Sequence, residues 1–257
     1  MDASGIESGV EASKLVAAEP YLIEQDWDAY TPEQHAIWTE LVSRRMPQLE
    51  SHACAEYLDG FGASGLQVDC LPVLVDVSAR LQPRTGWNST AVSGFLPADA
   101  FFEMLAARRF PTTTWIRGRG SMEYTPEPDI FHDVFGHVPM HAHPVFADFL
   151  EHYGKVCAGL TSAEDLERMG RLFWFTVEFG LIRERGGVKV YGSGLISSHG
   201  ECTHVVERGA VLEIREFKLA DVLDTVVDVS KMQPVLYAIE SFEQIYEAAK
   251  EAESRVA

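Results

Sequence analysis

Residues 123–139 read EYTPEPDIFHDVFGHVP, the stretch of this chain that decides most about its fold and chemistry. Two histidines in it, His132 and His137, stand five positions apart. On an ideal α-helix such residues point about 140° away from each other, so a straight helix would not direct both at one ion. Gly136 permits a break in the helix, and Pro139 prevents it from continuing. We therefore predict that the helix ends between the two histidines, which lets both reach one metal ion.

A second stretch supports a metal site, because a histidine pair alone is more often part of the core or surface. Residues 172–182 read LFWFTVEFGLI, and Glu178 is the only charge among them. A carboxylate in such surroundings is costly unless it is paired or metal-bound. Its partner is either an arginine, such as Arg117 or Arg171, or a cation shared with His132 and His137. Two imidazoles and one carboxylate suit non-haem iron, and zinc with a bound water could use the same ligands.

Composition excludes several classes of protein. The 21 Lys and Arg residues against 39 Asp and Glu give a formal net charge of −18, which disfavours nucleic acid and anionic membranes as partners. No apolar stretch approaches the roughly 20 residues that cross a bilayer. The first residues, MDASGIESGVEASK, lack the basic start and apolar run of a signal peptide. We expect a cytoplasmic protein.

The pattern of apolar residues predicts one mainly α-helical domain with short β segments. Residues 1–25 are expected to form a loose N-terminal arm, and residues 26–257 the single domain. Thr31-Pro32-Glu33-Gln34 is a capping box with proline at the first helical position, so a helix should begin there. Further helices are predicted at residues 98–109, 128–136, 144–160, 163–185 and 240–256, and strands at residues 188–191 and 211–217.

Other motifs are weaker. Gly192-Ser193-Gly194 begins like a dinucleotide-binding motif, but Ser197 replaces the last glycine and no βαβ unit surrounds it. The sequence has no nucleophile elbow and no P-loop. The four cysteines form no CxxC pair, which argues against a thiolate zinc site or a disulfide framework. Serine hydrolases, kinases and dinucleotide-dependent enzymes are therefore disfavoured.

Three segments together identify a family. Residues 124–139, 174–181 and 191–201 closely resemble the pterin-dependent aromatic amino acid hydroxylases, in the order found there, and the shorter bacterial phenylalanine 4-hydroxylases are most similar. The resemblance covers about residues 26–246. It implies a mainly helical hydroxylase catalytic domain that uses Fe(II), tetrahydrobiopterin and O₂. By resemblance, His132, His137 and Glu178 would be the iron ligands.

The resemblance also implies residues that bind the amino acid. Arg117 would hold the substrate carboxylate, since a guanidinium can donate two charge-assisted hydrogen bonds to it; without the resemblance, a structural salt bridge would be the favoured interpretation. Trp174 would pack against the substrate ring, and it matches the phenylalanine enzymes, as Val229 does. The other residues implied in substrate binding are Tyr124, Thr125, Pro126 and Ser197.

The pterin site implied by the resemblance lies mainly in residues 94–101. Phe101 would stack on the pterin ring. Asp133 and Ala98 stand where animal members of the family have glutamate and serine. The full set implied in pterin binding is Gly94, Phe95, Leu96, Ala98, Phe101 and Asp133.

The resulting expectation is a phenylalanine 4-monooxygenase that converts L-phenylalanine to L-tyrosine. Alternatives are tryptophan 5-hydroxylation, phenylalanine 3-hydroxylation, a zinc hydrolase on the same three ligands, and a non-catalytic amino acid or pterin binder. The residues before position 26 are too few for the regulatory domain of animal members, and the tail after Ile245 is too short for their tetramerisation helix. We therefore expect an unregulated monomer.

Overall fold

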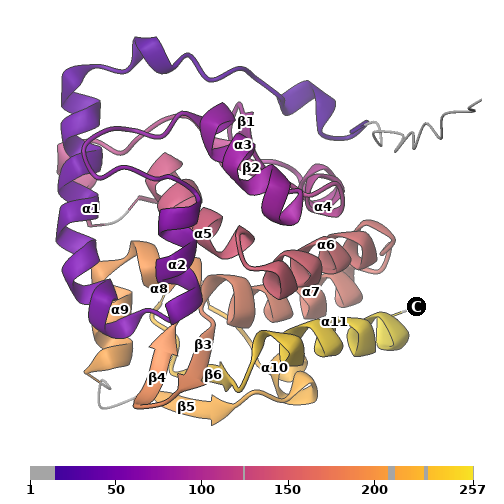
Figure 1. The fold of residues 1–257 in the computed structure, drawn as a ribbon. Helices are drawn as coiled ribbons and strands as arrows, with labels where there is room; N and C mark the ends of the chain where they lie inside the picture. Colours follow the sequence, from indigo (N-terminus) through magenta and orange to yellow (C-terminus); the bar gives the residue numbers. More distant parts are fainter. Residues whose placement is uncertain (1–14, 124, 208–211, 229–230, 257) are drawn as a thin grey trace, which may run out of the picture.

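The computed structural model describes residues 15–123, 125–207, 212–228 and 231–256 (Figure 1). Over these residues the chain is mainly helical with two small sheets, which confirms the fold class expected from the sequence. No helix in these ranges is both long and apolar enough to cross a membrane.

The helices surround a core that runs through most of the described chain. Two π-helical turns, Phe131–His137 and Trp174–Glu178, contribute buried residues to it and carry the three predicted metal ligands. Short 3-10 turns are Glu19–Tyr21, Trp27–Ala29 and Arg119–Ser121. The α-helices are α1 (Pro32–His52), α2 (Ala55–Ala63), α3 (Leu74–Thr85), α4 (Ala98–Ala106), α5 (Val138–His141), α6 (Pro144–Ala158), α7 (Ala163–Phe173), α8 (Ser193–Ser197), α9 (His199–Val206), α10 (Leu219–Asp224) and α11 (Phe242–Val256).

The predicted start of α1 is confirmed. The Gln34 backbone N–H donates to the Thr31 hydroxyl at 3.3 Å, and the Thr31 backbone N–H donates to the Gln34 side chain at 2.8 Å. This reciprocal capping box satisfies two N–H groups that a helix start otherwise leaves without partners. Trp38, one helical turn further on, is fully buried and donates from its indole N–H to the Gln67 carbonyl. The cap thus fixes where α1 enters the core.

Two sheets complete the fold. Strands β1 (Asn88–Val92) and β2 (Arg109–Thr113) pair in parallel. The residues implied in pterin binding begin at Gly94, shortly after the end of β1. The second sheet has the order β4-β3-β6-β5, drawn in orange and yellow in the lower part of Figure 1. In it only the pair β3 and β4 is antiparallel. Its strands are β3 (Leu181–Glu184), β4 (Gly187–Val190), β5 (Glu213–Glu216) and β6 (Val235–Ile239).

Two predicted helices are too long. The helix expected over residues 163–185 ends at Phe173, passes through the π-turn, and gives way to β3. The helix expected over residues 98–109 ends at Ala106, and β2 begins at Arg109. In both places the chain stays apolar across the boundary, so the periodicity of apolar residues did not show where the helix gives way to a strand. Pairing with a strand far away in the sequence decides where the new strand begins.

His141 is an unusual core residue, fully buried beside Trp87 at a ring-centroid distance of 4.7 Å. Neither ring nitrogen has a hydrogen-bond partner among the described residues. Burial lowers the pKa of His141 well below 6.5, with the nearby His137 adding to the effect. The folded protein therefore keeps this imidazole neutral at pH values where the unfolded chain protonates it.

We expect His141→Leu to raise the free energy of unfolding by about 1 kcal/mol at pH 7, because it removes an unsatisfied buried polar group. The advantage should widen by about 1.4 kcal/mol per pH unit below 6.5, where only the unfolded parent chain takes up the proton. Denaturant unfolding of the metal-free proteins at about pH 7 and about pH 5.5 measures both effects. The exposed His199 offers a control: His199→Gln should follow the parent, and an equal pH dependence in His141→Leu would refute the prediction.

Candidate metal centre and adjoining cavity

His132 and His137 are brought to one face by a π-helix. The sequence predicted a helix that ends between them, and this is wrong: helical turns continue from Phe131 through Pro139 to His141. Hydrogen bonding from residue i to residue i+5 widens the turn, so residues five apart lie close to one another around the helix. A spacing of five residues prevents two histidines on an α-helix from sharing a metal ion, but on this π-helix the same spacing allows it.

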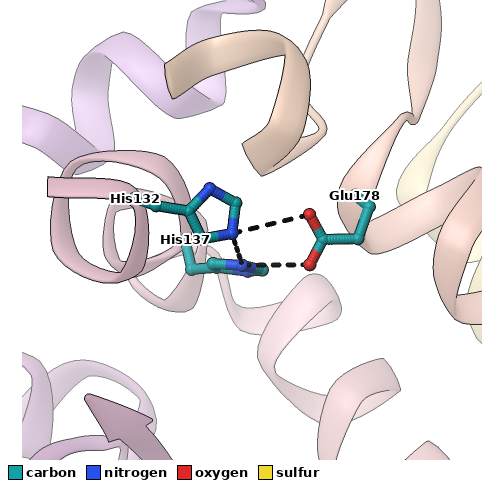
Figure 2. Close-up of side chains that lie close together, drawn as sticks. All are labelled: His132, His137 and Glu178. Atoms are coloured by element: carbon teal, nitrogen blue, oxygen red, sulfur yellow. Dashed lines mark hydrogen bonds and ion pairs between the residues drawn. The ribbon is translucent and has the colours of Figure 1, made fainter. Parts of the chain in front are cut away.

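The three predicted ligands converge on one point, as Figure 2 shows. His132 Nε2 lies 3.2 Å from His137 Nε2 and 3.7 Å from Glu178 Oε2, and His137 Nε2 lies 3.2 Å from Glu178 Oε1. The Glu178 carboxylate comes from the second π-turn, where the Phe179 N–H donates to the Trp174 carbonyl at 2.8 Å. Both π-turns thus serve to place ligands, a frequent use of this conformation at functional sites.

Helix α8 holds two of the ligands in place through serines. The Ser193 hydroxyl donates to Glu178 Oε2 at 2.8 Å, and the Ser197 hydroxyl lies 2.9 Å from His132 Nδ1. Such outer contacts fix the tautomer and orientation of metal ligands. The resemblance implied instead that Ser197 helps to orient the amino acid. Ser193 was given no role, since nothing distinguishes this serine within its Gly-Ser-Gly run.

Gly136 explains how α8 comes so close to the π-helix that carries both histidines. A Cβ atom at this position would lie 3.1 Å from both the Cβ and the carbonyl oxygen of Ser193. The glycine was predicted to break the helix, but it lies inside a continuous helix. Its lack of a side chain lets α8 approach the histidines.

The charge states of His132 and Glu178 suit the binding of a cation. Burial lowers the pKa of His132 to about 4, although the Glu178 carboxylate opposes this. Burial alone would raise the pKa of Glu178, but His137, and then His132 and Ser193, bring it down to about 2. At pH 7 His132 is therefore a neutral donor and Glu178 an anionic one, which are the protonation states that metal binding requires.

These residues fit an iron ion. Metal bonds to imidazole nitrogen and carboxylate oxygen are about 2.0–2.2 Å long, so donors at right angles around one ion lie about 3 Å apart. The observed 3.2–3.7 Å between donor atoms is close to this. Two imidazoles and one carboxylate on one side of an ion form the ligand set of non-haem Fe(II) oxygenases, with positions left open for other ligands.

A second cluster of Cys54, Glu56 and Glu184 also has donor atoms within 4.8 Å of one another. Two of its groups already have a structural task at the start of α2. The Cys54 sulfur accepts from the Tyr57 N–H, and Glu184 accepts from the Ala55 N–H. We therefore assign no metal to it.

An apolar cavity of about 380 Å³ opens onto the three ligands. Six phenyl and phenol side chains contribute to its wall, a lining suited to a flat ring: Phe95, Phe101, Phe102, Phe110, Tyr153 and Phe173. Every residue that the resemblance implied in pterin binding lines the same cavity. Asp133 is one of them, and burial raises its pKa to about 7 against the bonds that it accepts from Thr113.

Arg117 lies in a buried ion pair with Asp129. A structural salt bridge was the interpretation favoured without the resemblance, but the sequence did not identify its partner. Its Nε donates to Asp129 Oδ2 at 2.8 Å and its Nη2 to Oδ1 at 2.7 Å, while Nη1 donates to the Met122 carbonyl at 3.3 Å. Asp129 also accepts from the His132 backbone N–H at 3.1 Å, so it joins Arg117 to the metal centre. A guanidinium has more N–H donors than these contacts use, so donors remain for a substrate carboxylate. Nothing local singled out Asp129, because Glu127 and Asp133 stand close to it in the sequence.

Like Arg117, the other described residues implied in substrate binding lie outside the lining of the cavity. Trp174 stacks on Phe179 at 4.8 Å between ring centroids, and its indole nitrogen has no partner among the described residues. Thr125 donates to the Glu127 carbonyl, and Pro126 is exposed. None of these residues lines the cavity. Tyr124 and Val229 lie outside the described residues.

Comparison with known proteins agrees with this site. A family model described as biopterin-dependent aromatic amino acid hydroxylase matches residues 26–256. A phenylalanine-4-hydroxylase of Chromobacterium violaceum is 38% identical over 231 residues, which cover 90% of this chain and 77% of the relative. A tyrosine 3-monooxygenase of Homo sapiens is also 38% identical over 231 residues, covering 88% of this chain and 43% of that relative.

The fold agrees as well. The crystal structure of the Chromobacterium violaceum phenylalanine hydroxylase with bound oxidized Fe(III) matches with a TM-score of 0.89 and 37% identity, covering 93% of this chain and 86% of that one. Other structures of the same enzyme hold iron(III) with 7,8-dihydrobiopterin, or iron with phenylalanine. This chain belongs to the biopterin-dependent aromatic amino acid hydroxylases. It is a pterin-dependent monooxygenase, and its relatives above include enzymes of phenylalanine and of tyrosine.

Ser197→Ala should separate the two roles considered for this serine. Because its hydroxyl contacts His132 Nδ1, we expect iron affinity to fall by about 10- to 100-fold. A role in orienting the amino acid would instead raise the KM for the amino acid and leave iron affinity unchanged. Competition with a chelator measures the first, and steady-state kinetics at saturating iron the second. Ser254→Ala, on the exposed end of α11, should change neither.

Proposed function

We propose that this enzyme hydroxylates L-phenylalanine to L-tyrosine with O₂ and a tetrahydropterin at a non-haem iron site formed by His132, His137 and Glu178. The observation that carries the proposal is the convergence of these three side chains at the wall of an aromatic-lined cavity. The Chromobacterium violaceum enzyme, with the same fold, holds iron with a pterin and iron with phenylalanine in its crystal structures.

The cofactors supply the oxidising chemistry: iron and the reduced pterin together activate O₂ for attack on the aromatic ring. The protein positions the groups and limits water. Ser193 and Ser197 fix Glu178 and His132, and the lowered pKa values of these two residues leave an anionic carboxylate and a neutral imidazole for the metal. The aromatic wall would hold the pterin ring, and Phe101 would be the residue that stacks on it. Asp133, with its pKa of about 7, offers a carboxyl group that can donate or accept a hydrogen bond at that ring.

The amino acid is held by Arg117. Its unused N–H donors receive the substrate carboxylate, and the Asp129 contact keeps the guanidinium fixed relative to His132. Because the guanidinium holds the carboxylate and is itself held by Asp129, the substrate ring is placed near the metal before the reaction begins. Trp174 stacks on Phe179 beside Glu178 and does not line the cavity, so its contact with an unsubstituted substrate ring is proposed from the resemblance alone.

A side-by-side product assay tests the proposal. The purified protein is loaded with Fe(II) and incubated in air with a tetrahydropterin and phenylalanine, tyrosine or tryptophan. We expect tyrosine from phenylalanine as the main product, and none without iron or with zinc in its place. Main products of 5-hydroxytryptophan or meta-tyrosine would instead establish one of the alternative hydroxylations. A zinc-dependent hydrolysis, or ligand binding without turnover, would contradict hydroxylation altogether.

The monomeric state and the cytoplasmic location stay predictions from the sequence. Light scattering of the iron-loaded protein checks the first, and a stable tetramer would contradict it.

A further inference from the structure

The segment before α1 is not a loose arm where the structure describes it. The sequence predicted such an arm over residues 1–25, yet residues 15–23, which we call the N-terminal strap, pack closely on α4. Ala18 is fully buried. The backbone N–H groups of Val16 and Ala18 donate to Glu103 Oε1 at 2.8 Å and Oε2 at 2.9 Å. Both oxygens of one α4 carboxylate thus hold the strap.

The strap also pairs with the chain at the entrance to the cavity wall. The Ile23 N–H donates to the Ala91 carbonyl at 3.1 Å, and the Ser93 N–H donates to the Tyr21 carbonyl at 2.9 Å. Leu22 forms an antiparallel bridge to Val92, the last residue of β1. These bonds stop at Ser93, the residue before the loop that carries Gly94, Phe95 and Leu96.

Between the strap and α4 lies a small apolar core, separate from the main one. Its buried members are Ala18, Val92, Leu96, Ala100 and Met104, and Leu15, Ala17, Tyr21, Leu22 and Phe101 pack against it. Val92, Leu96 and Phe101 also line the cavity that opens onto the metal ligands. One layer of side chains therefore has the strap on one side and the cavity on the other.

Next to this layer, the part of the cavity wall formed by Gly94 and Phe95 has few packing contacts of its own. Phe95 is 81% exposed although it lines the cavity. Gly94 has a φ of +153° and nothing within 4 Å of the place where a Cβ would be. Before the loop, Val92 and Ser93 bond to the strap directly. Behind it, Leu96 lies in the same apolar cluster as Ala18 of the strap.

We propose that the N-terminal strap positions the pterin-binding wall of the cavity, and that Glu103 is the positioning residue that holds it there. The inference rests on the proposed function, because it takes the ligand of this wall to be the pterin. Glu103 does not line the cavity, so it acts through Phe101 on its own helix and through the strap on Leu96. Loss of the anchor should weaken pterin binding and leave the metal ligands and Arg117 undisturbed.

Three variants test the positioning role. Glu103→Ala removes both acceptors, Glu103→Gln keeps one acceptor on a side chain of equal length, and Ala18→Leu crowds the strap from a different position. Titration calorimetry with 7,8-dihydrobiopterin on the iron-loaded proteins gives the dissociation constant. We expect it to rise about fivefold or more in Glu103→Ala and Ala18→Leu, and less in Glu103→Gln. Iron content and the KM for phenylalanine should stay at the parental values, while the KM for tetrahydropterin rises with the dissociation constant.

The controls separate this inference from simple stabilisation. Glu207→Gln, an exposed glutamate after α9, should bind the pterin as the parent does. A lower melting temperature with unchanged pterin binding in all three variants would overturn the positioning role and leave the proposed function standing. A parent protein that binds no dihydrobiopterin would overturn the proposed function, and this inference with it.

Discussion

Glu178→Ala is expected to abolish turnover and to leave the purified protein without stoichiometric iron. The carboxylate is the only anionic donor of the triad, and both of its oxygens lie within 3.7 Å of an imidazole nitrogen. Metal-ion catalysis contributes several kcal/mol, and each 1.36 kcal/mol is tenfold in rate, so activity should fall by at least about a thousandfold. Metal analysis and a tyrosine-formation assay measure the two losses.

A graded series shows that the effect belongs to the carboxylate. Glu178→Gln keeps the shape but not the charge, so it should lose iron nearly as Glu178→Ala does. Ser193→Ala removes only the hydrogen bond to Oε2 and should lower iron affinity by about 10- to 100-fold. Glu164→Gln, exposed in the first turn of α7, should retain full activity. Iron content and activity at the parental level in Glu178→Ala would remove this residue from the site.

Glu178 shows which parts of the site the sequence alone could predict. A single charge among ten apolar or small neighbours already demanded a partner, so the residue could be picked out without its geometry. His132 and His137 were selected as well, but for a mistaken reason. A π-turn differs from an α-turn by one hydrogen-bond register, and the apolar pattern of the segment hardly changes with it. The π-helical register agrees with the close packing of this segment against α8, which Gly136 permits.

The outer contacts of the site could not be predicted in the same way. Ser193, Ser197 and Asp129 act through hydrogen bonds to residues far away in the sequence or on another element. Local patterns carry no trace of such partners. The same holds for the N-terminal strap: small residues without periodicity suggest a loose arm, whereas burial of Ala18 depends on α4, some 80 residues later in the chain.

Arg117→Ala is expected to destabilise the fold and to weaken amino acid binding at the same time. Asp129 is fully buried, and removal of its partner would leave an uncompensated charge, at a cost of about 3–5 kcal/mol. The Asp129 contact to the His132 N–H would then loosen the metal ligand too. A raised KM for phenylalanine in this variant alone would therefore not show that Arg117 touches the substrate.

The double variant Arg117→Met with Asp129→Asn separates the two effects. It removes both buried charges, but the single amide oxygen of the new asparagine can accept from only one of the two backbone N–H groups, of residues 117 and 132, that the carboxylate serves. The free energy of unfolding should therefore recover from the loss in Arg117→Ala and stay about 1–3 kcal/mol below the parent. The KM for phenylalanine should stay raised by about tenfold or more, because no guanidinium remains to receive the substrate carboxylate. Arg119→Ala, which removes only exposed ion pairs to Glu33 and Glu40, should change neither quantity. Denaturant unfolding and steady-state kinetics on the iron-loaded proteins give both values. Recovery of the parental KM in the double variant would make Arg117 a purely structural residue, since only its pairing with Asp129 would then have mattered.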